Sequence, residues 1–316
     1  MARTRLAEWL GKIASDDSML SDVDSYDDYA HLLDAVRGIR WPARAAVRGG
    51  IPGAHTSRLR GISAEFTEYR PYRQGDDPRR IDWKLFARSN RAYIRLSNDR
   101  AILPTMIVID ASASMAFPVA TSAKWKLAAQ LGVGLGAVAR NSGDPVGLVI
   151  AGGDEPVMLS PRMRRSVIQE IIRAVSATQP GGITPLAPSV SIAAQSGGRL
   201  VIVTDFLGDA ADVLATASSW VAAGREVHAI HVVAQEEMDP SHESTMVSDP
   251  EIVEIRRPMI GEARDRYVEK FASWRDEIAH EWSDAGISYT LAVTGAETVD
   301  HLIRRIAAVR SGGAIV

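Results

Sequence analysis

The chain has 316 residues, of which 46% are hydrophobic and 24% are charged, a composition typical of globular domains. Its formal net charge of −3 argues against a bulk electrostatic attraction to nucleic acid or to an anionic membrane. The chain has no cysteine, which excludes disulfides, thiolate catalysis and Cys-ligated zinc.

Targeting features of the sequence favour a cytoplasmic protein. The N-terminal stretch MARTRLAEWLGKIASDD lacks the long apolar core of a signal peptide. The most apolar stretch, residues 127–139, is shorter than the roughly 18 residues that a membrane helix needs, and it is typical of a buried helix. We therefore expect no membrane span, and the absence of cysteine fits a reducing compartment.

The first hundred residues have an uneven charge distribution. Residues 13–36 contain seven aspartates and neither lysine nor arginine, whereas residues 37–100 contain fifteen lysines and arginines against six acids. Such runs are usually solvated faces that partly neutralise each other, and a docking surface is the alternative. We predict that residues 1–100 form an N-terminal segment with an acidic helix and a basic motif, and that residues 101–316 form a separate domain.

The basic motif lies within residues 61–96. AEFTEYRPY and RAYIRL alternate like strands, QGDDP is typical of a turn, and RRIDWKLFARS suits a short helix. Its charged and aromatic residues form either an ion-pair network that pins the segment to the second domain, with Trp83 as an anchor, or a partner-binding face. The residues in question are Arg70, Tyr72, Arg73, Asp76, Asp77, Arg79, Asp82, Trp83 and Arg88.

Short β-branched runs alternate with longer helical stretches after residue 104. Strands are predicted over residues 105–110, 145–152, 156–160, 199–206, 225–234 and 287–293. Helices are predicted over residues 121–143, 161–178 with Pro161 in the first turn, 185–196, 209–224, 261–286 and 297–310, and a polar loop over 235–258. This alternation predicts an α/β fold whose mostly parallel central sheet has helices on both faces, preceded by a smaller N-terminal α+β segment.

A glycine-rich stretch, GVGLGA at residues 132–137, matches a loose dinucleotide-binding pattern. Gly132, Gly134 and Ala137 are spaced as in G-x-G-x-x-A, with Gly136 between the last two, but they lie inside a predicted helix instead of directly after a strand. The context therefore favours close packing of this helix over nucleotide binding.

Two predicted strands end in aspartate, at the sheet edge where α/β folds bind ligands. These residues are Asp110 and Asp205, and Ser112 and Ser114 follow Asp110 at alternate positions. A carboxylate after a buried apolar run is costly unless it is paired or binds an ion. Thr184, in the Gly-rich turn QPGGITPL, supplies a further hydroxyl. Such oxygen donors predict a site for Mg²⁺, or for Mn²⁺ or Ca²⁺, and a Ser/Thr-rich turn with capping side chains is the alternative.

These residues resemble a known metal site. D-A-S-A-S at residues 110–114, Thr184 in GGITPL and Asp205 in VTDF are similar to the metal-ion-dependent adhesion site (MIDAS) of von Willebrand factor A domains. The resemblance implies a von Willebrand factor A (Rossmann-like) fold and a metal ligand set of Asp110, Ser112, Ser114, Thr184 and Asp205. Ile183 stands between the glycines and the threonine, where the family more commonly has G-G-T.

The upstream motif resembles a narrower family. R-x-Y-x-x-G-D-D-P-R-x-I-D-W at residues 70–83, H-x-S at 55–57 and DPVGLVI at 144–150 are similar to the bacterial and archaeal domain-of-unknown-function family 58. Members of that family carry an A-type domain and often accompany MoxR-type AAA+ ATPases. The resemblance implies a MoxR-type AAA+ ATPase as partner of an adaptor or co-chaperone, together with a protein ligand that bears an acidic residue.

A non-catalytic interaction module is the function that these features favour. A Mg²⁺-dependent phosphohydrolase would share the strand-end aspartates, but the chain has no aspartate two residues after Asp110 and no evident general base. Nucleic-acid binding through residues 37–100 is a third hypothesis. That segment is basic and contains aromatic residues, yet acids are interleaved with its basic residues, so we expect no nucleic-acid partner.

Overall fold

The computed structural model describes residues 29–43, 52–56, 66–74, 76, 78–97, 100–152, 155–240, 246–248, 256–258 and 261–308. Asp77 lies outside these ranges, as do all acidic residues before Asp34. The predicted acidic helix is therefore described only from Tyr29 onward, where residues 29–35 are helical.

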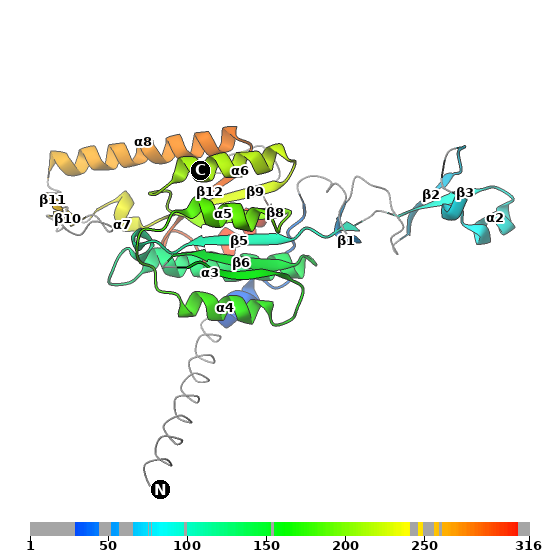
Figure 1. Ribbon diagram of the computed structural model, residues 1–316, viewed down its shortest axis with the longest axis horizontal. Coiled ribbons are helices and arrows are strands. Elements are labelled where there is room, and N and C mark those ends of the chain that lie inside the picture. The colour runs from blue at the N-terminus through cyan, green and yellow to red at the C-terminus, as the bar shows by residue number, and fades with distance from the viewer. Residues whose placement is uncertain are drawn as a thin grey trace, which may run out of the picture.

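A six-stranded sheet forms the centre of the fold (Figure 1). Its order is β12 (Ser288–Val293), β9 (Glu226–Val233), β8 (Arg199–Thr204), β5 (Thr105–Asp110), β6 (Val146–Ala151) and β7 (Val157–Arg162). All neighbouring pairs are parallel except β6 and β7, which are antiparallel. The inner strands β5, β6, β8 and β9 are buried along their whole length, as continuous apolar runs are when helices cover both faces of a sheet. The predicted α/β fold class is thus confirmed.

Helices cover both faces of this sheet (Figure 1). Those packed in the hydrophobic cluster on one face are α3 (Ala123–Asn141), α4 (Val167–Ala177) and α9 (Val299–Ala308). Those in the cluster on the other face are α5 (Leu186–Ala194), α6 (Ala210–Ala222) and α8 (Glu262–Asp284). No helix among the described residues combines the length and the apolarity that crossing a membrane requires.

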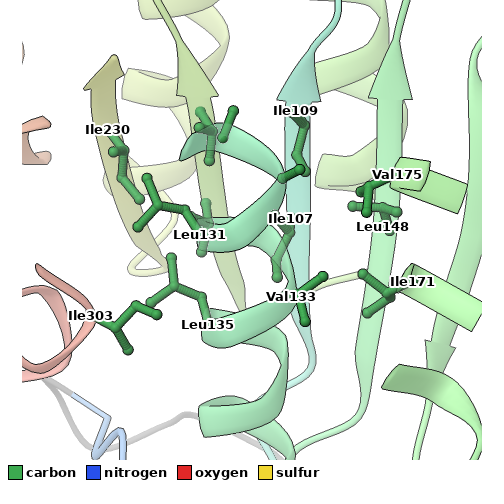
Figure 2. Packing of buried hydrophobic residues seen from close by; sticks show 14 of the residues in the cluster. Ile107, Ile109, Leu131, Val133, Leu135, Leu148, Ile171, Val175, Ile230 and Ile303 are labelled. Carbon is green, nitrogen blue, oxygen red and sulfur yellow. The ribbon is translucent and has the colours of Figure 1, made fainter. Parts of the chain in front are cut away.

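The glycines of α3 let this helix pack closely against its neighbours. A Cβ atom at Gly132 would lie 2.5 Å from Ile109 Cδ1, and one at Gly134 would overlap Ile303. Figure 2 shows the result, with α3 placed against β5 and its leucines directed toward side chains of other elements. The interpretation of the glycine pattern as helix packing is confirmed, because all three glycines lie inside α3.

Residues 29–43 pack on the same face as α3. Val36 and Trp41 are buried in that hydrophobic cluster. The Trp41 amide donates a hydrogen bond to Ser142 Oγ at 2.6 Å, and the Arg199 guanidinium lies 4.3 Å from the centre of the Trp41 ring. This part of the N-terminal segment therefore contributes to the core around the central sheet.

Smaller elements lie outside the central sheet. They are β1 (Pro52–Thr56) paired with β4 (Arg100–Ala101), β2 (Phe66–Pro71) paired with β3 (Tyr93–Ser97), η1 (Pro78–Arg80), α2 (Trp83–Ser89) and η2 (Ala113–Ala116). The polar loop predicted over residues 235–258 is wrong, because that region contains α7 (Gln235–Met238) and β10 (Met246–Ser248), which pairs with β11 (Arg256–Pro258).

The predicted helix start at Pro161 is also wrong. Arg162 pairs with Val146, so β7 runs through Pro161, and α4 begins only at Val167. Proline cannot donate to a strand ladder but is tolerated in an edge strand, and β7 is the edge of this sheet. Pairing with β6 therefore prevails over the preference of proline for a first helical turn.

Candidate functional site

The candidate site is built where β5 and β8 end side by side. Because these strands are adjacent and parallel, Asp110 at the end of β5 lies next to Thr204 at the end of β8. Thr204 Oγ1 donates a hydrogen bond of 2.6 Å to Asp110 Oδ2, and the Ser112 amide donates one of 2.9 Å to Asp110 Oδ1. Ser112 Oγ lies 3.0 Å from Ser114 Oγ. The D-A-S-A-S stretch thus gathers a carboxylate and two hydroxyls.

Asp110 is buried, and the groups of the described residues that donate hydrogen bonds to it, Thr204 Oγ1 and the Ser112 amide, are neutral. Burial, followed by the nearby charge of Asp205, raises the pKa of Asp110 to about 6, while the hydrogen bonds from Thr204 and Ser112 act in the opposite direction. The environment therefore disfavours the carboxylate form of Asp110 unless positive charge is supplied nearby. Thr204 was not among the residues predicted for the site, although its position directly before Asp205 at a strand end could have indicated it.

Asp205 is bound to a cation of the chain itself. The fully buried ammonium group of Lys124 lies 2.7 Å from Asp205 Oδ2 and 2.9 Å from Glu237 Oε1. Burial alone would lower the pKa of Lys124, but the two carboxylates raise it above its ordinary value, so this group stays charged. Sequence reasoning missed Lys124 and Glu237, because nothing in AKWKL distinguishes buried Lys124 from exposed Lys126.

Thr184 lies in the loop that covers the hydroxyl cluster. The Ala113 amide donates to the carbonyl of Gly182 at 3.0 Å, and the Gly181 amide donates to the carbonyl of Ala111 at 2.9 Å. These bonds hold the Gly-rich loop against the D-A-S-A-S stretch, with Gly182 at a φ of 75° that favours glycine. Thr184 consequently lines the same pocket as Asp110 and Ser112.

That pocket has a volume of about 230 Å³. Its walls include Leu186, Phe206 and Val213 beside the polar groups. Asp209 closes one side, because its two carboxylate oxygens accept the amides of Leu186 and Ala187 at 3.0 and 2.9 Å. Ser114 and Asp205 are not among its lining residues. The structure therefore brings Asp110, Ser112 and Thr184 to one pocket. Ser114 contacts Ser112, and Asp205 pairs with Lys124.

The donor set fits a hard divalent cation in part. Carboxylate and hydroxyl oxygens of Asp110, Ser112, Ser114 and Thr184 are the type of ligand that Mg²⁺ prefers. Asp205 fits less well as a direct ligand, since one of its oxygens is held by Lys124 and the other accepts the Leu207 amide at 3.2 Å. No group of three His, Cys, Asp or Glu side chains within the described residues is arranged for a metal, so hydroxyls must contribute to any such site here.

The residues of the basic motif bind mainly to one another. Arg70 pairs with Asp76 at 2.8 Å, and the Arg73 amide donates to the same carboxylate. Asp82 caps α2 by accepting the amides of Lys84 and Leu85, and it also accepts the Tyr69 hydroxyl. The Tyr72 amide donates to the Ala92 carbonyl, while Arg79 and Arg88 are exposed. Trp83, which we expected to be an anchor, has 61% of its surface exposed, and its ring contacts Phe86 of the same helix.

The mostly parallel sheet covered on both faces, with D-x-S-x-S after its central strand β5, defines a von Willebrand factor A-like protein. Within that class, the chain belongs to the family described as "Protein of unknown function DUF58", whose model matches residues 68–277.

Three known proteins are similar to the chain over most of its length. "Uncharacterized protein Rv1480" of Mycobacterium tuberculosis (strain ATCC 25618 / H37Rv) is 26% identical over 300 residues, covering 90% of this chain and 92% of that protein. A crystal structure of an aerotolerance-related membrane protein from Bacteroides fragilis has 20% identity and a TM-score of 0.42, covering 65% of this chain and 98% of that one. The conserved hypothetical protein BatB from Bacteroides thetaiotaomicron has 16% identity and a TM-score of 0.38, with 65% and 97% covered.

Proposed function

We propose that this protein is a non-catalytic protein–protein interaction module. In this proposal, Asp110, Ser112, Ser114 and Thr184 would hold a divalent cation, Mg²⁺ or else Mn²⁺ or Ca²⁺, with Asp205 in an outer position. A bound divalent cation supplies an electrophilic position for an acidic oxygen of a partner protein. The family resemblance suggests that the protein acts as an adaptor or co-chaperone of a MoxR-type AAA+ ATPase.

One observation carries the proposal. The hydroxyls of Ser112 and Ser114 lie 3.0 Å apart next to a buried carboxylate whose pKa is raised to about 6. A buried carboxylate in such surroundings is stabilised by a nearby positive charge. The adjoining pocket gives a partner side chain access to Asp110, Ser112 and Thr184.

The small number of carboxylates also favours binding over catalysis. Ser112, and not a second carboxylate, stands two residues after Asp110, and its amide donates a hydrogen bond to Asp110. With neutral hydroxyls as ligands, a divalent cation would keep excess positive charge. That excess charge would attract an acidic group of the partner.

The proposal is tested by measuring binding of the full-length protein to the MoxR-type ATPase encoded in the same genome. Binding is measured in Mg²⁺, in EDTA, and after Mg²⁺, Mn²⁺ or Ca²⁺ is restored. We expect EDTA, Asp110→Asn and the Ser112→Ala/Ser114→Ala pair each to weaken binding about tenfold or more. Ser122→Ala is the matched control, because this nearby hydroxyl makes no cap hydrogen bond. Binding that is insensitive both to EDTA and to Asp110→Asn would refute a cation-dependent interface.

A further inference from the structure

The pocket beside the proposed cation site also has an extensive apolar lining. The side chains that share it with Asp110, Ser112 and Thr184 come from the loop before α5, the start of α5, the loop after β8 and the start of α6. The apolar members of this lining are Ile183, Pro185, Leu186, Phe206, Ala210 and Val213. One cavity therefore joins the carboxylate and hydroxyls proposed to hold a cation to a surface suited to an apolar group.

Contacts within the chain hold the walls of this pocket in place. Asp209 accepts the first two amides of α5 with its two carboxylate oxygens. Phe206 adopts a left-handed backbone conformation, with a φ of 57°, which a bulky residue keeps only where its surroundings fix it. Its amide donates to Thr204 Oγ1 at 3.2 Å, and its ring lies 4.7 Å from that of Trp282. A ligand thus meets a formed pocket and does not have to order its walls.

The size of the pocket suits a side chain better than a small-molecule ligand. Its volume is about 230 Å³, whereas sites for drug-sized molecules have roughly 300–1,000 Å³. Ile183 lines the pocket and is 67% exposed, so it lies at the opening. Leu207, between the lining residues Phe206 and Gly208, is 48% exposed. Apolar surface outside the pocket favours an occupant that continues beyond it, as a protein chain does.

We infer that this pocket receives an aliphatic side chain of the partner protein, next to the acidic residue that would reach the cation. The inference rests on the proposed function and adds the chemistry of the partner to it. In an extended segment, side chains two positions apart point to the same side. The segment that fits is therefore Asp or Glu, any residue, and then Leu, Ile or Val.

The lining favours this occupant over a phosphate group. Among the described residues, no lysine, arginine or histidine lines the pocket. The amides of Leu186 and Phe206 already donate to Asp209 and to Thr204. A phosphate on the cation would find few donors for its remaining oxygens, whereas a carboxylate followed by an aliphatic side chain matches both parts of the lining.

The test is a methyl NMR titration of the full-length protein with defined probes. The first probe is a short Gly/Ser peptide with one Glu and, two positions further on, one Leu. The second has Ser in place of Leu, the third has Gln in place of Glu, and the fourth is inorganic phosphate. Each is titrated in Mg²⁺ and in EDTA. The methyl groups of Leu186 and Val213 report on the pocket, and those of Ile303, in the cluster on the other face of the sheet, serve as reference.

Two variants with matched controls locate the aliphatic side chain. Ala210→Leu replaces a pocket-lining alanine by a larger residue, and Ala211→Leu is its control at the next, exposed position of α6. Ile183→Ser removes apolar surface at the opening, and Ile192→Ser is its control at a residue of α5 that is 40% exposed. Ile183 is exposed, so Ile183→Ser keeps the test valid if Ala210→Leu fails to fold.

In Mg²⁺, we expect the glutamate–leucine peptide to bind at least about tenfold more tightly than the serine peptide and to shift the Leu186 and Val213 methyl signals. Ala210→Leu should reduce this preference to less than about threefold, and Ile183→Ser should weaken it. Both control variants should keep it. The glutamine peptide should bind weakly, and EDTA should weaken binding of both glutamate peptides.

The outcomes separate this inference from the proposed function. If EDTA weakens binding but the leucine and serine peptides bind equally, the cation-dependent interface stands and the inference is refuted. If neither EDTA nor the change of Glu to Gln affects binding, the proposed function fails, and the inference fails with it. A leucine preference that survives in both Ala210→Leu and Ile183→Ser would place the aliphatic side chain elsewhere. Tighter binding of phosphate than of the leucine peptide would assign the pocket to an anion.

Discussion

Replacing Lys124 with methionine should be among the most destabilising single changes in this protein. The substitution keeps the apolar stem but removes an ammonium group that is fully buried and in contact with two carboxylates, whose side chains are 3% and 14% exposed. Removing one partner of a buried ion pair costs about 3–5 kcal/mol, because the remaining charge is left without compensation. For a chain of this size, that corresponds to a fall in melting temperature of roughly 6–20 °C.

The assay is equilibrium unfolding in urea, monitored by circular dichroism. Lys126→Met is the matched control, since Lys126 is exposed and lies two residues further along the same helix, and it should cost less than about 0.5 kcal/mol. Adding Asp205→Asn to Lys124→Met should recover about 1–2 kcal/mol, because it removes one of the two unpaired carboxylates. The reasoning is refuted if Lys124→Met costs less than about 1 kcal/mol, or if Asp205→Asn worsens the Lys124→Met protein.

Three further predictions concern the packed core. Burial lowers the pKa of His231 to about 3, whereas the same imidazole in the unfolded chain is protonated below about pH 6.5. The stability that the neutral imidazole contributes above pH 6.5 should therefore decline as the pH falls toward 3, and the urea midpoint of His231→Gln should decline less steeply. Trp41→Ala should cost about 3–5 kcal/mol by calorimetry, because the buried ring packs under the Arg199 guanidinium; a cost below about 1 kcal/mol would contradict this packing. Gly147→Ala should cost about 1–3 kcal/mol in urea unfolding, because the Cβ of the new alanine would lie 2.6 Å from the Leu159 carbonyl oxygen. An unchanged urea midpoint would show that β7 moves away without cost and would contradict this prediction.

The fold could largely be predicted from local sequence patterns. Runs such as TMIVID and RLVIVT have four consecutive apolar residues at their centres, a pattern typical of strands covered on both faces, and these strands are β5 and β8. The exception at Pro161 has a tertiary origin. The preference of proline for a first helical turn is local. Its place in β7 depends instead on pairing with β6, whose Val146 lies sixteen residues before its partner Arg162.

The candidate site divides in the same way between sequence and tertiary structure. The sequence by itself placed Asp110, Ser112 and Ser114 together, because their relation depends on a few consecutive backbone angles after one strand. Only the tertiary structure decided which groups surround Asp110 and Asp205. Lys124 is 81 residues from Asp205 along the chain, and Thr204 is 94 residues from Asp110. Parallel strands join residues that are distant in sequence, and the burial that makes an internal ammonium group pair with carboxylates exists only after the helices have packed on the sheet.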